Sequence, residues 1–282
     1  MIDRHLAQRI GFALLFLATL LVVVPIFVVI GVVIVRGLPA ISWEFLTAPP
    51  RSGMTEGGIF PALVGTIILT LGTAIASIPV GVGGAIYLAE YASDNWWTRA
   101  IRLAIVNLAG VPSVVYGLFG LGLFVLFLQM GTSILAGSLT LAIMTLPVII
   151  SSAEEALRAV PVEFRTVSAS LGGTRWQGIW RIVLPQAMPG VVTGVLLGLL
   201  RAAGETAPIL FTVVAFFLPT LPHSPFDQTM ALPYHLYVVS TQVPGMPPEI
   251  QFGTALVLMG LVLSMNVAAT LVRRRFRSRR QW

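Results

Sequence analysis

Apolar residues form six long runs along the chain, and most polar residues gather between them. Each run is close to or longer than the roughly 20 residues that a helix needs to cross a bilayer. The runs are continuous rather than alternating with a period of two, which favours helices over the strands of a barrel. They are Ile10–Val35, Ala62–Tyr87, Ile101–Gln129, Ser133–Ile150, Pro189–Pro219 and Phe252–Val272. The pattern predicts an all-α, polytopic membrane protein with six transmembrane helices.

The composition agrees with this prediction. Of 282 residues, 56% are hydrophobic and 10% are charged, whereas about 25% of a soluble globular chain is charged. The first apolar run follows Arg4 and Arg9, as a secretory signal would, but it is longer than the apolar part of a signal. We therefore expect a retained span. The absence of cysteine excludes disulfides and thiolate metal sites.

The basic residues, all arginines, are distributed unevenly between the predicted loops. If the N-terminus is cytoplasmic, 14 of the 17 lie on the cytoplasmic side, Arg36 and Arg51 lie outside, and Arg201 lies within a span. The positive-inside rule then predicts that both termini are cytoplasmic. The 14 are Arg4, Arg9, Arg99, Arg102, Arg158, Arg165, Arg175, Arg181, Arg273, Arg274, Arg275, Arg277, Arg279 and Arg280.

The predicted organisation has three parts. Residues 1–61 hold the first span and an outer loop, residues 62–272 form the core, and residues 273–282 form a basic cytoplasmic tail. The tail is interpreted as a topology anchor, with binding to anionic lipid as the alternative. The core spans are rich in glycine and proline, and Pro79 and Pro112 are expected to kink their helices. These small residues predict helix packing or a water-lined pathway.

The longest cytoplasmic segment, residues 151–188, is predicted to form two short helices. The first begins at a capping box, either Ser152 with Glu155 or Ser151 with Glu154, and is broken or re-angled at Pro161. It runs toward Leu171 and stops at Gly172–Gly173, because glycine adopts the left-handed backbone conformation of a helix C-cap at little energetic cost.

The second helix begins at another capping box, Thr174 with Gln177, and is expected to stop before Pro185. Its apolar residues share one helical face, which we expect a partner or the membrane surface to cover. They are Trp176, Ile179, Trp180 and Val183. The whole segment is therefore predicted to project from the membrane as a helix-turn-helix.

One spacing in this segment is similar to a known motif. Gly172, nine residues and then Ile182-Val183-Leu184-Pro185 resembles the coupling motif of binding-protein-dependent ABC permeases. The family begins that motif with Glu-Ala-Ala, where this chain has Thr166, Val167 and Ser168. The resemblance implies a type I ABC importer permease fold and a loop that docks on a cytoplasmic ATPase subunit. An amphipathic loop resting on lipid headgroups is the alternative.

The residues of the coupling loop follow from this resemblance. They are Arg165, Gly172, Thr174, Trp176, Ile182, Leu184 and Pro185. The chain contains no lysine, which excludes the phosphate-binding loop with its G-K-[ST] signature. We therefore expect no catalytic residue and no cofactor in this chain, with ATP bound and hydrolysed by a partner subunit.

Two charges lie in the fifth apolar run. Arg201 and Glu205 are four residues apart, so on one helix they would share a face and could pair. A charge in the membrane is costly, and such residues often mark a substrate pathway. In this interpretation, Arg201 binds a passing oxyanion through the planar set of donors of its guanidinium. Glu205 would hold Arg201 in place and keep the empty pathway close to neutral charge. A purely structural ion pair is the alternative. Pro208 is expected to bend the helix beside the pair.

Residues 201–208, Arg-Ala-Ala-Gly-Glu-Thr-Ala-Pro, also resemble the fifth span of phosphate-type permeases of the PstA branch, as do residues 36–46, 110–117 and 231–237. The resemblance implies a bacterial inner-membrane location and a heterodimer with a PstC-type permease. It also implies PstB-type ATPase subunits and a periplasmic PstS-type phosphate-binding protein. A homodimer and another oxyanion, such as molybdate, sulfate or phosphonate, remain open.

Functions of other classes fit less well. The three histidines, His5, His223 and His235, are scattered and no H-E-x-x-H motif is present, so neither a zinc enzyme nor another metal site is expected. A stand-alone secondary transporter would not need the projecting helix pair. The basic charge sorts by membrane side, so no nucleic-acid partner is expected.

Overall fold

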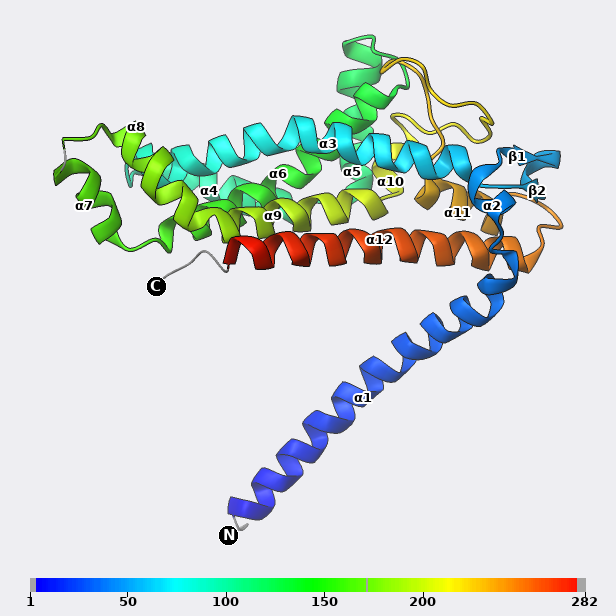
Figure 1. The fold of residues 1–282 in the computed structure, drawn as a ribbon, viewed down its shortest axis with the longest axis horizontal. Helices are drawn as coiled ribbons and strands as arrows, with labels where there is room; N and C mark the ends of the chain where they lie inside the picture. The colour runs from blue at the N-terminus through cyan, green and yellow to red at the C-terminus, as the bar shows by residue number, and fades with distance from the viewer. Residues whose placement is uncertain (1–3, 171, 278–282) are drawn as a thin grey trace.

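The computed structural model describes residues 4–170 and 172–277, which form a helical bundle with a small hairpin at one end (Figure 1). The α-helices are α1 (Arg4–Gly37), α2 (Trp43–Thr47), α3 (Phe60–Ile86), α4 (Trp96–Ala109), α5 (Ser113–Gly120), α6 (Ile134–Arg158), α7 (Val162–Ser170), α8 (Arg175–Gly178), α9 (Leu184–Gly204), α10 (Ala207–Leu210), α11 (Leu232–Thr241) and α12 (Pro248–Arg277). The other elements are the 3-10 helices η1 (Leu38–Ala40) and η2 (Ser52–Met54), the π-helices η3 (Tyr87–Tyr91), η4 (Leu121–Phe127) and η5 (Ile179–Val183), and the strands β1 (Pro50–Arg51) and β2 (Glu56–Gly57).

The membrane-spanning part confirms the predicted all-α architecture. Among residues 4–170 and 172–277, five helical stretches are long and apolar enough to cross a bilayer, and a bent pair of helices brings the number to six when the pair is counted as one span. Figure 1 shows α3, α9 and α12 lying along the long axis of the molecule, with α6 packed against α3 and α9. The helices α7 and α8 lie at one end of this bundle, and the β1–β2 hairpin lies at the other.

The central helix of the bundle is α6, which is the most buried of the spans. Its Leu141, Met144 and Ile149 are each 2% exposed or less. Glycines allow the neighbouring helices to come close, because a helix without side chains on one face can approach another backbone. On α9 these glycines recur every fourth residue, and on α3 two of them face α6. They are Gly190, Gly194 and Gly198 of α9, and Gly72 and Gly81 of α3.

The third span is broken rather than merely kinked. Between α4 and the α5–η4 segment the chain turns by 103°, and Pro112 lies at the turn as the residue before α5. Proline cannot continue the hydrogen-bonding pattern of α4, which explains a break at this position. Pro79, in contrast, lies inside α3, which continues through it.

The fifth span is shorter than the predicted Pro189–Pro219. Helix α9 ends at Gly204, and Glu205 has an extended backbone with φ −77° and ψ 139°. Beyond the short helix α10, the backbone pairs with a later segment through a parallel bridge between Val214 and Thr229. The apolar run therefore continues past the helix because residues 207–214 enter the packed core, where Ile209 and Val213 are buried.

The first helix stands apart from the bundle. The most apolar part of α1 has no buried residue, and Figure 1 shows this helix diverging from α12. The two meet near the end of α1, where Gly37 lies against the backbone of Phe252 and Arg36 stacks over the Phe252 ring at 5.4 Å. A helix that is apolar on all sides is suited to lipid or to another protein chain.

The directions of α1 and α12 are consistent with the prediction that both termini lie on the same side of the membrane. The beginning of α1 and the end of α12 point toward the end of the molecule that carries α7 and α8 (Figure 1). The predicted basic tail begins within α12, which includes Arg273 to Arg277, and residues 278–282 lie outside the described part of the chain. The cytoplasmic location of this end stays a prediction.

The packing of α3 against the segment before α11 leads to a prediction for two glycines of α3. A methyl group at Gly65 would overlap the carbonyl oxygen of Met230, whereas one at Gly83 would meet nothing within 4 Å. We expect Gly65→Ala to lower the free energy of unfolding by about 1–3 kcal/mol, because overpacking forces the backbone apart. Gly83→Ala, the control, should leave it unchanged or raise it slightly. Thermal unfolding in detergent measures both, and equal melting temperatures would contradict this packing.

Candidate functional site

The predicted projecting segment lies at one end of the bundle and is built around a left-handed glycine. Helix α7 is followed by Gly172, whose φ is +73°, a conformation that costs glycine little. The next helix starts at the predicted capping box, since the amide of Gln177 donates to Thr174 Oγ1 at 3.3 Å and the Thr174 amide donates to Gln177 Oε1 at 2.9 Å. Leu171, the predicted end of the first helix, lies outside the described residues.

The predicted helix start at Ser151 or Ser152 is wrong, because α6 continues unbroken through both residues to Arg158. Here tertiary packing overrides the local capping signal, since Ser152 faces Gly194 of α9 and Ala153 is fully buried. The first break comes just before Pro161, as expected, and α7 begins at Val162.

The predicted helix stop before Pro185 is also wrong. The helix runs without interruption from Arg175 to Gly204 and passes through the π-helix η5, in which the amide of Leu184 donates to the carbonyl of Ile179. In the wide π turn, amides bond to carbonyls five residues back instead of four. Pro185 has no amide to donate, and this local change of the hydrogen-bonding pattern accommodates it at the start of α9.

The apolar face of the second helix is only partly exposed. Ile179 and Val183 are buried in a core cluster with Leu157 of α6, so the prediction that all four apolar residues need an outside partner is corrected. Trp176 and Trp180 are 56% and 55% exposed, and their rings stack at 5.5 Å. Both line an apolar groove of about 690 Å³ between α3 and α9. Ile182 and Leu184 are half-buried, and Pro185 is exposed.

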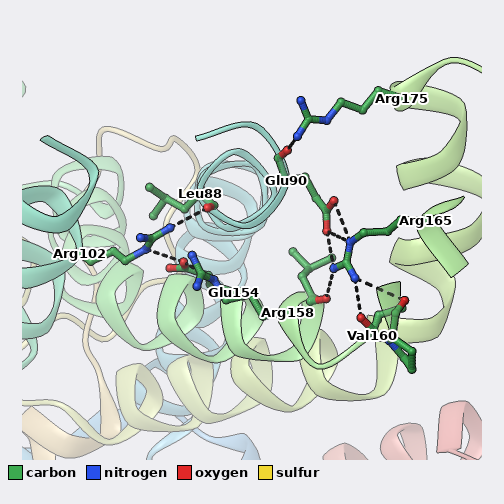
Figure 2. A network of polar contacts seen from close by, with 10 residues as sticks. Leu88, Glu90, Arg102, Glu154, Arg158, Val160, Arg165 and Arg175 are labelled. Carbon is green, nitrogen blue, oxygen red and sulfur yellow. Dashed lines mark hydrogen bonds and ion pairs between the residues drawn. The ribbon is translucent and has the colours of Figure 1, made fainter. Parts of the chain in front are cut away.

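Two buried glutamates organise the charges at this end of the bundle (Figure 2). Glu90 was not singled out from the sequence, and Glu154 was considered only as a capping residue. Glu154 of α6 accepts a hydrogen bond from Arg102 Nε at 2.7 Å and pairs with Arg158 at 3.0 Å. Arg102 also donates to the carbonyl of Leu88 at 2.9 Å. This cluster ties α4 to α6 and to the end of the second span.

The second glutamate, Glu90, contacts the projecting segment. Its carboxylate accepts hydrogen bonds from Arg165 Nη2 at 2.8 Å and from Arg165 Nε at 3.2 Å. Arg165 also donates to the carbonyls of Leu157 and Val160, so its guanidinium is fully engaged. Figure 2 shows Arg175 reaching the backbone carbonyl of Glu90 from the other side. The signal in the sequence is a glutamate at the C-terminal end of an apolar span, where the helix dipole disfavours a negative charge.

An exposed ion pair lies close to this network without joining it. Arg99 donates twice to Asp94, at 3.1 Å each, and the two side chains are 71% and 73% exposed. The hydrogen bond and charge of Arg99 hold the pKa of Asp94 below its usual range. This pair is a suitable control for the buried ones.

The predicted Arg201–Glu205 pair is present, but not on one helical face. Arg201 Nε lies 3.3 Å from Glu205 Oε1, and the helix ends between them at Gly204. The predicted bend at Pro208 is not found in α9, because α9 has already ended and Pro208 lies in the separate helix α10. The side chains of Arg201 and Glu205 are 37% and 18% exposed. Glu205 also lines a small cavity of about 10 Å³ with Thr66 and Thr70, which is room for about one water molecule.

The described residues offer no metal centre. Among residues 4–170 and 172–277, no group of three or more histidine, aspartate or glutamate side chains is arranged to hold a metal ion. The three histidines predicted to be scattered are on α1, in the loop before α11 and on α11.

Comparison with known proteins identifies the architecture. Residues 81–278 match the family described as the inner membrane component of binding-protein-dependent transport systems. This chain belongs to that family. It is a multi-pass permease subunit of an ABC importer, and the matched region of the permease contains the whole Gly172–Pro185 motif.

Several relatives resemble the permease over nearly its full length. The phosphate transport system permease protein PstA of Mycobacterium leprae is 36% identical over 276 residues, which cover 94% of this chain and 88% of that protein. The probable phosphate transport system permease protein PstA of Methanocaldococcus jannaschii is 33% identical and covers 88% of this chain and 87% of that protein. The probable ABC transporter permease protein YqgI of Bacillus subtilis is 35% identical, with 84% and 85% covered.

Solved structures share the fold. A bacterial ABC transporter involved in the import of alginate has a TM-score of 0.68 at 14% identity, covering 96% of this permease and 99% of that chain. The MetNI methionine ABC transporter in an inward-facing conformation has a TM-score of 0.63 at 15% identity, covering 76% and 94%. These likenesses confirm the predicted type I importer fold.

The left-handed turn at Gly172 leads to a prediction about the loop of the permease. Nothing lies within 4 Å of a methyl group placed on Gly172, so only its backbone conformation resists a side chain. Gly172→Val should destabilise the turn by about 1–2 kcal/mol, and faster amide hydrogen exchange of residues 162–178 should report it. Gly172→Asn is the matched control, since asparagine tolerates this conformation. Equal exchange in both variants would contradict the role of the turn.

Proposed function

We propose that the chain is the PstA-type permease subunit of a phosphate importer in the bacterial inner membrane. The observation that carries the proposal is the likeness of 33–36% over most of the chain to proteins named as phosphate transport permeases. The resemblance noted in residues 201–208 agrees with it. The solved structures of similar fold are a methionine ABC transporter and a transporter involved in the import of an acidic polysaccharide, so the fold alone does not favour phosphate.

In the proposed complex, a PstC-type permease pairs with this chain, and a periplasmic PstS-type protein delivers phosphate. Two PstB-type subunits bind and hydrolyse ATP on the cytoplasmic side. The loop of residues 151–188 docks on one of them through α7, whose residues Val162, Glu163, Thr166 and Val167 are exposed. Closure of the ATPase moves this loop, and the spans that continue from it, α6 and α9, move with it.

The proposed pathway passes Arg201. This guanidinium is partly exposed at the end of α9 and keeps hydrogen-bond donors beyond the one that Glu205 accepts. Its planar fork suits a tetrahedral oxyanion, and the break of the helix at Gly204 gives the irregular backbone that membrane proteins place beside a pathway. Molybdate, sulfate or phosphonate would fit the same chemistry, which makes another oxyanion the second candidate.

Uptake by cells that lack their own high-affinity phosphate system tests both roles. The chain is supplied with its operon partners, at equal membrane expression for each variant. Arg201→Ala should reduce phosphate uptake by roughly 10-fold or more, because a charge-assisted hydrogen bond to the anion contributes about 1.5–3 kcal/mol. Arg201→Lys should be impaired less, since it keeps the charge and loses the fork.

Arg51→Ala is the control for this experiment, because it removes an arginine of the β1–β2 hairpin that is 61% exposed and lies 3.6 Å from Glu44. It should leave uptake unchanged. Normal uptake by Arg201→Ala would reduce the Arg201–Glu205 pair to a structural role. If the wild type takes up no phosphate but takes up molybdate, sulfate or phosphonate, the substrate assignment moves to that oxyanion.

A further inference from the structure

Glu90 occupies a position that needs a physical explanation. It lies in the π-helix η3, which extends the C-terminal end of α3, and only 7% of its side chain is exposed. The carbonyls at a helix C-terminus repel an anion, and a buried carboxylate is costly without partners. Glutamate at this place is therefore favourable only because of the cations that reach it.

Both cations come from the projecting segment. Arg165 of α7 holds the carboxylate with a two-pronged contact, and Arg175 of α8 donates to the Glu90 backbone carbonyl and lies over the Tyr91 ring at 5.0 Å. One arginine precedes the Gly172 turn and the other follows it. The two halves of the helix pair are thus attached to the same turn of η3.

The two helices of the pair pack closely against each other. A methyl group on Gly173 or Gly178 would lie 2.6 Å from the Ser168 hydroxyl or 3.0 Å from its Cβ. Glycine at these two places brings α8 close to α7. A force applied to one helix of the pair reaches the other through this contact.

The chain itself connects the pair to α6 and α9 but not to α3. Arg165 and Glu90 are 75 residues apart in sequence, and Arg175 and Glu90 are 85 apart. We propose that Glu90 is a positioning residue that couples the second span to the projecting loop, so that α3 moves with α6 and α9 when the loop is displaced. This inference rests on the proposed function, in which the loop receives the movement of the ATPase.

The test uses the complete transporter, assembled from this chain, its paired permease, the ATPase and the binding protein, in proteoliposomes. Phosphate uptake and ATP hydrolysis are measured on the same vesicles. Glu90→Gln keeps the size of the side chain and removes its charge. We expect transport per ATP hydrolysed to fall about 5-fold or more, with assembly and ATP hydrolysis retained. Asp94→Asn, which breaks the exposed pair with Arg99, should leave the ratio unchanged.

A double variant separates coupling from folding. Glu90→Gln alone leaves Arg165 without its anion, and this can destabilise the fold by itself. Glu90→Gln with Arg165→Gln removes both charges, so it should recover the part of the thermal stability that the unpaired charge of Arg165 costs, but not the part due to the hydrogen bonds of Arg165 to the carbonyls of Leu157 and Val160, and it should remain uncoupled. Recovery of the transport ratio together with stability would overturn the coupling role, because a purely structural pair would behave in this way.

Amide hydrogen exchange of the chain in detergent tests the attachment without any transport. Exchange of residues 162–178 should be faster in Glu90→Gln than in the wild type and in Asp94→Asn. Unchanged exchange would show that Glu90 does not hold the loop, whatever the transporter carries. A wild-type complex that moves no phosphate, with faster exchange in Glu90→Gln, would instead count against the proposed substrate and leave the attachment supported.

Discussion

The close approach of α6 to α3 and α9 sets the position of the other elements. In a bilayer no water-driven force brings helices together, so association depends on packing and on interhelical hydrogen bonds. Glycines at 190, 194 and 198 on α9, and at 72 and 81 on α3, let the backbones meet. Because α6 lies between these partners, the direction in which it leaves the core fixes where the projecting helix pair stands.

The two candidate functional regions lie toward different ends of the same packed unit. At one end, α6 ends at Arg158 beside the two glutamate clusters, and the helix pair follows. Toward the other end, α9 stops at Gly204, next to Arg201 and Glu205. The helix that carries Arg201 is continuous with the one that starts at Arg175, after its N-cap Thr174. In the proposed function, movement of the loop would reach the charged pair through this one continuous helical stretch.

The number and type of the spans were predictable from the sequence because membrane insertion depends on long apolar runs. Their ends were less predictable, since an apolar run does not show whether its residues enter a lipid-facing helix or a packed irregular core. Residues 207–214 illustrate this, as do Ser151 and Ser152, whose capping signal gives way to packing against α9. The predicted helix stop before Pro185 was wrong for a related reason, because the π turn that lets the helix continue depends on the surrounding helices as well as on local sequence.

The projecting site was predictable where its contacts are local and unpredictable where they are distant. The Thr174 capping box and the left-handed Gly172 involve neighbours within a few residues, and both are present. Arg165 was singled out by resemblance to a family motif, but nothing in the local sequence joined it to Glu90. A carboxylate at the wrong end of a helix dipole is the one physical signal that would have drawn attention to that residue.

The Arg201–Glu205 pair has a consequence for how firmly an anion can be held. On the proposed pathway, an arriving oxyanion does not meet a vacant guanidinium, because a carboxylate attached to the same chain already occupies one of its donors. Such a built-in competitor has a high effective concentration at the arginine and shortens the time that any passing anion stays there. A conducting site works best when it holds its cargo weakly enough to release it. High affinity would then belong to the protein that captures the anion, and low affinity to the membrane passage.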